Sequence, residues 1–256
     1  IWNAFRLVKG WEVEDSIDQP ETAKIATQWF DNVISKTIEE MDDLFSKYRL
    51  SEALMLVYKL FWDEFSSWYL ELVKPAYQQP IDKVTYEATL SFFDFLLRLL
   101  HPFMPFITEE LWQAIAPREN GESIMISQLP LSKAYDNNFL SDFEHTKHII
   151  AGIRTIRLQK NIPNKDVLSL EILGAHNAAY DSAIEKMGNL SNIESVTEKS
   201  AGAASFMVGT TEFAVPLTEN IDVEAELEKM RAELTYQEGF WKWVEKKLSN
   251  EKFVAN

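Results

Sequence analysis

A stretch of the sequence with five basic residues and no acidic one is the strongest candidate for binding chemistry. It runs between Glu144 and Asp166 and contains Lys147, Arg154, Arg157, Lys160 and Lys165. Lys147 and Arg154 are seven residues apart and Arg157 is three further on, so on a helix they form one stripe. We expect this stripe to bind a phosphate backbone, because clustered ammonium and guanidinium groups neutralise phosphates. The alternative is a solvated helix face whose charges pair with neighbouring acids.

Residue types that support catalysis or metal binding are sparse. The sequence has 0 cysteines, which excludes disulfides and thiolate metal ligands, and it has no glycine-rich phosphate loop. His145 and His148 are close enough on a helix to share a metal ion. No third ligand accompanies them, and zinc usually takes four. We therefore expect no metal site, no cofactor and no catalytic residue in this chain.

The overall charge opposes binding to a nucleic acid, because the formal net charge is -15. The basic stretch answers this objection, since such binding depends on local rather than net charge. No apolar run approaches the ~20 residues that a membrane span needs. There is no signal peptide either, so we expect a cytoplasmic protein without membrane contact. The chain begins with Ile1 rather than methionine, and we expect it to be a piece of a longer protein.

Helical periodicity dominates the first half of the chain. In Pro20–Tyr48 apolar residues recur every three or four positions, which predicts an amphipathic helix. Leu50–Val73 and Tyr86–Leu100 are apolar on nearly all sides, which predicts helices buried between neighbours. With further helices at Trp2–Lys9 and after Pro105, these segments predict an antiparallel helical bundle.

The second half alternates between extended and helical patterns. Extended segments are expected at Ser123–Leu129, Val167–Leu173, Ile193–Val196, Phe206–Val208 and Glu212–Val215. Helices are expected at Leu140–Lys160 and Asn177–Met187. The last two extended segments flank Gly209-Thr210-Thr211, a hairpin signal. These patterns predict a small α/β subdomain with a mainly antiparallel sheet.

The last segment has the cleanest periodicity in the chain. The seam consists of Val223, Leu227, Met230, Leu234, Gln237, Trp241, Val244 and Leu248, with spacings of four and three. Asp222 is well placed to cap this helix. A heptad seam needs a partner helix, so we expect the chain to self-associate through it.

Four sequence strings together resemble one protein family. HPFMPFITEELW (His101–Trp112) resembles the anticodon-binding domain of class I aminoacyl-tRNA synthetases for branched aliphatic amino acids, and most of all the valyl-tRNA synthetase family. IWNAFRLVKGW (Ile1–Trp11) resembles the helix that joins the family's catalytic core to this domain. The Phe-Trp-x-x-Phe and Trp-Tyr-Leu-Glu patterns of Tyr48–Pro75 also match. KLSNEKFVAN (Lys247–Asn256) resembles the turn of the coiled-coil arm typical of valyl enzymes.

The resemblance implies a mainly α fold in three parts. These are an antiparallel anticodon-binding bundle (1–129), a small α/β subdomain (130–218) and the first helix of a truncated coiled-coil arm (219–256). The family's ATP-handling signatures, His-x-Gly-His and Lys-Met-Ser-Lys-Ser, are absent from this sequence. The resemblance therefore implies a non-catalytic, tRNA-binding fragment of an ATP-using valine–tRNA ligase that is monomeric when complete. The isoleucyl or leucyl relatives and a helical protein-interaction module are the alternatives.

The resemblance also implies where tRNA binds. In class I relatives the first bundle helix presents polar and aromatic side chains to the anticodon loop, and the matching positions here are Trp2, Asn3, Arg6 and Lys9. We expect base discrimination near Arg6 and sequence-independent affinity from Lys147 to Lys165. A weaker candidate is the lysine cluster of the arm, which comprises Lys242, Lys246, Lys247 and Lys252.

Overall fold

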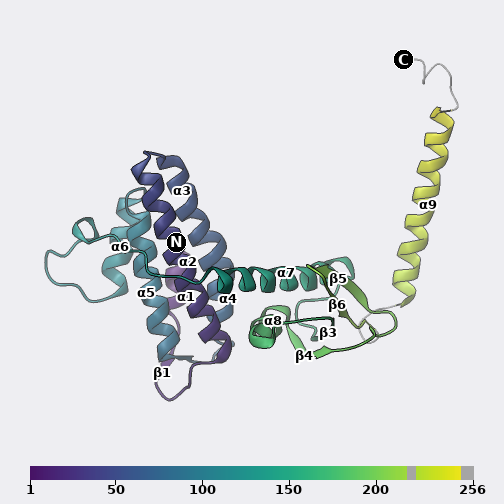
Figure 1. Cartoon of the computed structure of the whole chain (residues 1–256), viewed down its shortest axis with the longest axis horizontal. Coiled ribbons are helices and arrows are strands. Elements are labelled where there is room, and N and C mark those ends of the chain that lie inside the picture. Colours follow the sequence, from purple (N-terminus) through teal and green to yellow (C-terminus); the bar gives the residue numbers. More distant parts are fainter. Residues whose placement is uncertain (218–222, 249–256) are drawn as a thin grey trace.

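The computed structural model describes residues 1–217 and 223–248 of the chain. Figure 1 shows a helical part joined to a small sheet by the long helix α7, with α9 standing apart. The helices are α1 (Trp2–Lys9), α2 (Glu21–Ser46), α3 (Leu50–Lys59), α4 (Leu70–Val73), α5 (Lys83–Leu100), α6 (Pro105–Ile115), α7 (Asn137–Gln159), α8 (Asp181–Gly188) and α9 (Val223–Leu248). The π-helical segment η1 (Leu60–Tyr69) connects α3 to α4, and the 3₁₀ turns are η2 (Ile124–Ile126) and η3 (Ala178–Tyr180).

The strands form two sheets. They are β1 (Val13–Glu14), β2 (Ile81–Asp82), β3 (Leu168–Leu173), β4 (Leu190–Ser195), β5 (Ala204–Val208) and β6 (Thr211–Val215). The described part of the chain is thus mainly helical with small sheets, as the sequence predicts. None of its helices has the length and hydropathy that crossing a membrane requires.

Helices begin where the side chains satisfy the first backbone N–H groups. At the start of α5 the N–H of Thr85 donates to the buried carboxylate of Asp82 at 2.8 Å. At the start of α7 the N–H of Asn138 donates to Asp136 at 2.8 Å. Pro105 occupies the first turn of α6, where its missing N–H costs nothing. These capping hydrogen bonds and the proline determine where the helices begin.

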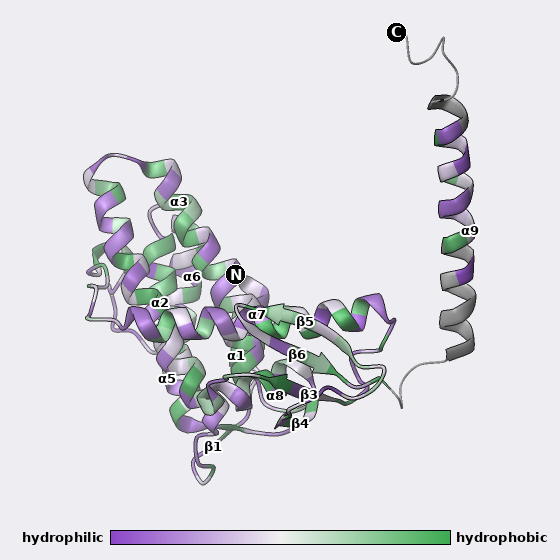
Figure 2. Cartoon of the chain, turned by 45° about the vertical axis from the view of Figure 1, so that its right-hand side comes forward, coloured by the Kyte–Doolittle hydropathy of each residue, from purple (hydrophilic) through white to green (hydrophobic). Residues whose placement is uncertain are grey.

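An aromatic cluster forms the core of the helical part. Phe30 of α2 stacks on Tyr69 of η1 with ring centroids 5.0 Å apart. Phe65 meets Phe93 of α5 edge to face at 5.5 Å, and Tyr69 meets Phe92 in the same way at 5.3 Å. Such contacts stabilise by ~1 kcal/mol each beyond the area that they bury. Figure 2 shows hydrophilic and hydrophobic residues alternating along these helices, as expected for helices that surround a core.

The segment Leu50–Val73 is helical throughout, but the expectation that its apolar sides are all buried between neighbours is wrong. One of its faces is uncovered, with exposed fractions of 41% for Leu54, 54% for Met55, 50% for Tyr58 and 53% for Trp62. The opposite face carries Ala53, Val57, Leu60 and Phe61, all of them buried. The physical reason is that neighbours α2 and α5 cover one side of this segment.

The prediction of an extended segment at Ser123–Leu129 is wrong in its middle, where Ile124–Ile126 form the 3₁₀ turn η2 between extended Ser123 and Ser127. The N–H of Met125 donates to the hydroxyl of Ser123 at 3.2 Å, which favours a turn. Glu109 of α6 then accepts from the Ser123 hydroxyl at 2.7 Å and from the N–H of Ile124 at 3.1 Å. The N–H of Ile124 is thus already bonded to a side chain and is not available to pair with a neighbouring strand.

The larger sheet has the strand order β4-β3-β6-β5. β3 pairs with β4 in parallel, whereas β6 is antiparallel to both β3 and β5. The predicted hairpin is therefore confirmed, with Gly209 in a left-handed conformation at its turn (φ 59). The expectation of a mainly antiparallel sheet is confirmed as well. A short parallel pair of β1 with β2 was not expected from the sequence.

A second hydrophobic core joins this sheet to α7 and α8. Buried residues from α7 include Ile149, Ile150, Ile153 and Ile156. They pack with Ile184 of α8 and with inward-facing residues of β3 and β6. The other half of α7 contributes Phe143 to the core of the helical part. The same helix therefore connects the two cores.

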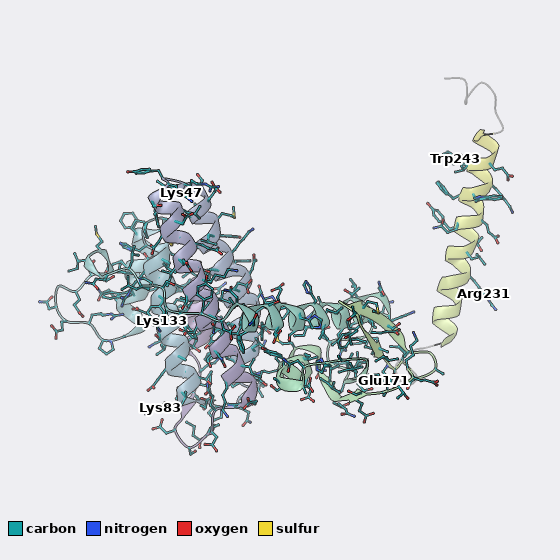
Figure 3. The ribbon with its side chains drawn as sticks, in the orientation of Figure 1. Lys47, Lys83, Lys133, Glu171, Arg231 and Trp243 are labelled. Atoms are coloured by element: carbon teal, nitrogen blue, oxygen red, sulfur yellow. The ribbon has the colours of Figure 1, made fainter. Side chains whose placement is uncertain are left out.

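Helix α9 bears an exposed apolar surface. Leu234 is 60% exposed and Trp241 is 66% exposed, and both belong to the expected heptad seam. Figure 3 shows the labelled Arg231 and Trp243 side chains projecting from this isolated helix. The expected cap Asp222 lies outside the described residues. The partner helix of the seam stays a prediction.

Packing between α7 and β5 predicts a strong effect of one methyl group. A Cβ at Gly152 would lie 2.2 Å from ring atoms of Phe206, far inside van der Waals contact. We expect Gly152→Ala to lower the free energy of unfolding by about 1–3 kcal/mol, as overpacking does. Urea denaturation of the complete protein measures this effect.

The matched control is Gly239→Ala on α9, where nothing lies within 4 Å of the added Cβ. There the helix propensity of alanine predicts a neutral or slightly stabilising change of up to ~1 kcal/mol. Equal effects of the two substitutions would contradict the close packing of Phe206 on α7.

Candidate nucleic-acid interface

Helix α1 presents three of the expected base-contacting residues on one exposed face. Trp2 and Arg6 are one helical turn apart, Asn3 lies beside them, and all three are exposed. Trp2 is 47% exposed, and its ring lies 5.7 Å from that of Phe5 with an angle of 32° between the ring planes. Val8, at 1% exposure, anchors the helix to the core. The face thus offers an aromatic plane, an amide and a guanidinium together.

The cations on α1 differ in how they are held. The ammonium of Lys9 donates to the carbonyl oxygen of Ile115 at 3.5 Å, which ties it to the end of α6. Arg6 forms no ion pair within the residues that the structure describes. A guanidinium without an internal partner keeps its donors available for an external acceptor. Arg6 is therefore better placed than Lys9 to contact a ligand.

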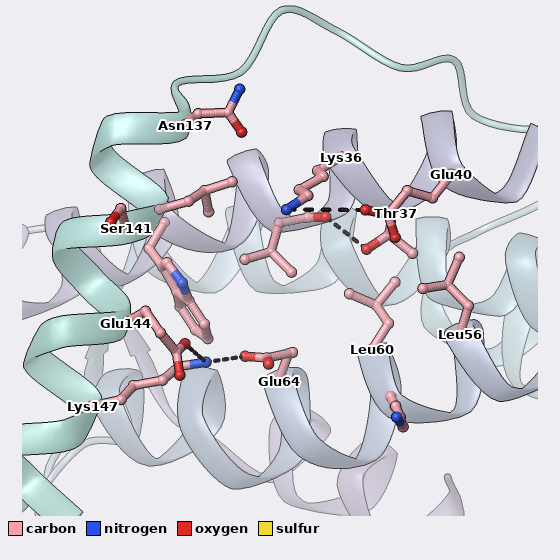
Figure 4. Close-up of a pocket in the computed structure, with 14 residues that line it drawn as sticks. Lys36, Thr37, Glu40, Leu56, Leu60, Glu64, Asn137, Ser141, Glu144 and Lys147 are labelled. Carbon is pink, nitrogen blue, oxygen red and sulfur yellow. Dashed lines mark hydrogen bonds and ion pairs between the residues drawn. The ribbon is translucent and has the colours of Figure 1, made fainter.

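The expectation of one continuous exposed basic stripe on α7 is wrong at Lys147. The side chain of Lys147 is 10% exposed and its ammonium lies 2.6 Å from a carboxylate oxygen of Glu64 and 3.3 Å from one of Glu144. The same ammonium lies over the rings of Trp29 at 4.9 Å and Trp68 at 5.5 Å. Figure 4 shows both ion pairs at one end of a pocket between α2, η1 and α7. Lys147 therefore docks α7 onto the helical part.

That pocket has a volume of about 470 Å³ and carries charges of both signs. Besides the Lys147 ion pairs it contains Lys36, whose ammonium lies 4.0 Å from Glu40. Lys36 and Lys147 are therefore paired with carboxylates, and Glu40, Glu64 and Glu144 add negative charge to the lining beside the further cation Lys59. The pocket therefore has no clear preference for an anionic ligand.

The basic stripe is also interrupted at Arg157, which is 5% exposed. Its guanidinium donates to four backbone carbonyls, those of Pro163 at 3.0 Å, Asp166 at 2.9 Å, Gly188 at 2.8 Å and Asn189 at 3.2 Å. Burial lowers the pKa of Arg157, and the nearby carboxylate of Asp166 opposes this shift. We call this arrangement the Arg157 clamp, because it fastens the end of α7 to the loop that follows it and to the end of α8. A phosphate cannot reach donors that are used in this way.

The exposed part of the basic stretch is smaller than expected. Arg154 is exposed, and its guanidinium lies over the ring of Trp68 at 5.3 Å. Lys165 is exposed in the loop after α7, and Lys160 is half-buried at the end of the helix. Arg154 therefore has a fixed position and an outward charge. Arg154 and Lys165, with Lys160 between them, remain candidates for phosphate contact.

Sequence reasoning missed an exposed aromatic pair on the helical part. The rings of Tyr58 and Trp62 stack at 6.0 Å with an angle of 5° between them. The charged residues Glu52, Lys59 and Asp63 fall on the same side of the helix by their spacing. That interleaving of charges was the available signal that this side faces solvent.

Comparison with known proteins adds the family context. The model of a family described as the anticodon-binding domain of tRNA ligase matches residues 27–172. The whole chain aligns with the valine--tRNA ligase of Parabacteroides distasonis at 66% identity over 255 residues, which is 29% of that protein. The corresponding enzymes of Bacteroides thetaiotaomicron and Brucella suis are 59% and 30% identical, each again over 100% of this chain. The chain thus spans less than a third of the length of these relatives.

The Arg157 clamp predicts a loss of stability when the planar guanidinium group is replaced. Lysine at this position keeps the charge but cannot reach four carbonyls, and a buried carbonyl without a partner costs ~1–3 kcal/mol. We expect Arg157→Lys to lower the free energy of unfolding by about 3 kcal/mol in urea titrations. Arg154→Lys on the same helix is the matched control, with a change within ~0.5 kcal/mol. Indistinguishable midpoints for the two variants would refute the clamp.

Proposed function

The chain belongs to the family of anticodon-binding domains of tRNA ligases, and we propose that it is the tRNA-reading part of an ATP-dependent valine–tRNA ligase. The observation that carries this proposal is the alignment of the entire chain with valine--tRNA ligases at up to 66% identity. Similarity at this level extends over the helical part, the sheet and α9 alike. The family model alone, which spans residues 27–172, would leave the amino acid open.

The exposed face of α1 is the proposed site of base recognition. An unpaired base stacks on an aromatic or guanidinium plane, and an amide can pair with its Watson–Crick edge. Trp2, Asn3 and Arg6 supply these groups on one accessible face. Arg154, Lys160 and Lys165 supply charge for the phosphate backbone, which adds affinity without sequence information. Buried Lys147 and Arg157 act by holding the fold.

Several finer features belong to the same proposal. The helical part is an antiparallel bundle. The chain divides into three parts, which comprise residues 1–129, 130–218 and 219–256. Helix α9 is one helix of a coiled-coil arm. The exposed Leu234 and Trp241 support the last point, since an apolar seam without a partner is unfavourable in water. ATP is used by the catalytic part of the complete protein, which is cytoplasmic and monomeric. This chain alone self-associates through the uncovered seam.

Two alternatives have specific discriminating features. An isoleucyl or leucyl ligase would share the helical part, and the discriminating result is preference for another tRNA. A protein-interaction module is favoured by the exposed apolar side of α9. The discriminating result for such a module is that the chain binds another protein tightly and does not bind tRNA.

The proposal is tested by fluorescence anisotropy of the complete protein with valine tRNA and with a transcript that differs only in the anticodon. Titrations at two salt concentrations separate backbone charge from base recognition. Salt-sensitive binding with preference for the native anticodon is the expected result. Absence of tRNA binding at low salt would overturn the proposed function.

Arg6 is expected to control which tRNA binds. Arg6→Ala should reduce the preference for the native anticodon roughly tenfold, because one good base contact is worth ~1–3 kcal/mol. The same anisotropy titrations measure this ratio. Arg49→Ala is the matched control, since Arg49 is exposed and its guanidinium is already paired with Glu52. Unchanged selectivity in Arg6→Ala would remove the assignment of α1 to base recognition.

Arg154 is expected to control affinity rather than selectivity. Arg154→Ala should weaken all tRNAs alike and reduce the slope of log affinity against log salt by ~1, the value for one lost phosphate contact. Arg154→Lys keeps the charge and should retain most of the slope. A selective effect on one tRNA, or an unchanged slope, would contradict a phosphate contact here.

A further inference from the structure

A second pocket lies beside the Arg157 clamp, and apart from Arg154 its lining residues have no ligand-binding role in the function proposed so far. Its volume is about 550 Å³, which falls within the range of small-molecule sites in proteins. It is lined by Arg154, Arg157, Leu158, Asn161, Ile162, Asn164, Met187, Gly188 and Asn189. The walls come from the end of α7, the loop after it and the end of α8. This size accommodates one nucleotide.

The frame of the pocket is fixed by hydrogen bonds that do not depend on a ligand. The guanidinium of Arg157 donates to the carbonyl of Gly188, which lines the pocket, and to that of Pro163 in the loop after α7. The side-chain amide of Asn189 donates to the carbonyls of Asn164 at 3.0 Å and Asp166 at 3.2 Å. A site held in this way loses little conformational entropy when a ligand enters.

Two amide groups on the lining are available for a ligand. Neither the Asn161 nor the Asn164 side chain has a hydrogen-bond partner among the described residues, and both are exposed. Each amide carries two N–H donors and one carbonyl acceptor. Asn161 adopts a left-handed backbone (φ 51), which asparagine tolerates better than most residues. Paired donors and acceptors of this kind match the Watson–Crick edge of a base.

The remaining lining suits the other parts of a nucleotide. Leu158 is 80% exposed at the rim, and Ile162 and Met187 add apolar surface against which a flat base can pack. Arg154 supplies an outward guanidinium, which is a strong phosphate ligand. None of the described residues that line the pocket is acidic. The combination of an apolar wall, free amides and one cation fits an unstacked nucleotide better than a free anion or an aliphatic ligand.

We propose that this pocket, named the Asn161–Asn164 pocket, receives one unstacked nucleotide of the bound tRNA, with its base against Leu158 and its phosphate on Arg154. The inference rests on the proposed function, because it presupposes that tRNA is the partner. It adds a contact to a base by the sheet part of the chain, in a region where charge alone was expected to act. The bound nucleotide lies outside the set read by the α1 face.

The test uses the complete protein with valine tRNA and a variant that removes both free amides. Asn161→Gly keeps the left-handed backbone without strain, and Asn164→Ala shortens the second side chain. The double variant is expected to bind roughly 5- to 10-fold more weakly with an unchanged salt slope, since hydrogen bonds rather than charges are lost. Asn138→Ala is the matched control, an exposed asparagine of α7 whose side chain has no partner among the described residues.

Chemical probing of Watson–Crick edges along the tRNA locates the contact. With the wild-type protein one unpaired position outside the anticodon should be protected, and the double variant should expose it while the anticodon stays protected. A second variant, Asn164→Trp, fills the pocket without changing charge and should give the same pattern. Melting temperatures close to that of the wild type show that the variants are folded.

The outcomes separate this proposal from the one on which it rests. If the wild-type protein binds tRNA but both variants leave the affinity and all protections unchanged, the pocket proposal is overturned and the proposed function stands. If the wild-type protein does not bind tRNA at low salt, both proposals fail. Loss of the single protection together with weaker binding supports the pocket.

Discussion

Helix α7 takes part in both hydrophobic cores, and the arrangement of the rest of the molecule depends on this sharing. Its first half brings Phe143 onto Trp29, with ring centroids 4.5 Å apart, inside the helical part. Its second half places Ile149 and Ile153 under the sheet. Cores are close-packed, so a 23-residue helix held at both ends cannot shift without opening a void in one of them. The docking of α7 therefore sets the position of the sheet, of the Arg157 clamp and of the Asn161–Asn164 pocket.

The cations of α7 serve two different purposes. A buried charge is tolerated only when it is paired and hydrogen-bonded, and Lys147 and Arg157 meet this condition with carboxylates and carbonyls respectively. Each of them has one partner that lies far away in the sequence, Glu64 at a separation of 83 residues from Lys147 and Gly188 at 31 residues from Arg157. Arg154 instead rests on an indole and keeps its charge outside. The first two cations hold the fold, whereas the third is exposed and is the one that we propose to bind tRNA.

Much of the fold could be predicted from the sequence because periodicity and capping are local. The helices, the hairpin at Gly209 and the mainly antiparallel sheet all follow from residues close together in the chain. The prediction for Ser123–Leu129 failed in part because the Ser123 hydroxyl donates to the carboxylate of Glu109, which lies 14 residues away in the sequence. The prediction that Lys147 and Arg157 are exposed was wrong because their burial depends on other elements. The spacing of charges on one helix carries no information about which elements cover it. The α1 face came from family resemblance, which periodicity alone would not have supplied.

The rigid attachment of α7 has a consequence for how long a bound partner stays in place. The two proposed sites, the Arg6 face and the Asn161–Asn164 pocket, would therefore meet tRNA at a fixed spacing. Once the first contact has formed, the second one is intramolecular and benefits from a high effective concentration, provided that the partner has matching dimensions. A partner with the right chemistry and the wrong span engages a single contact and dissociates quickly. If both proposed sites bind tRNA, the ion pair of buried Lys147 with half-buried Glu64 contributes to avidity without contacting the ligand, because it holds the spacing between the two sites.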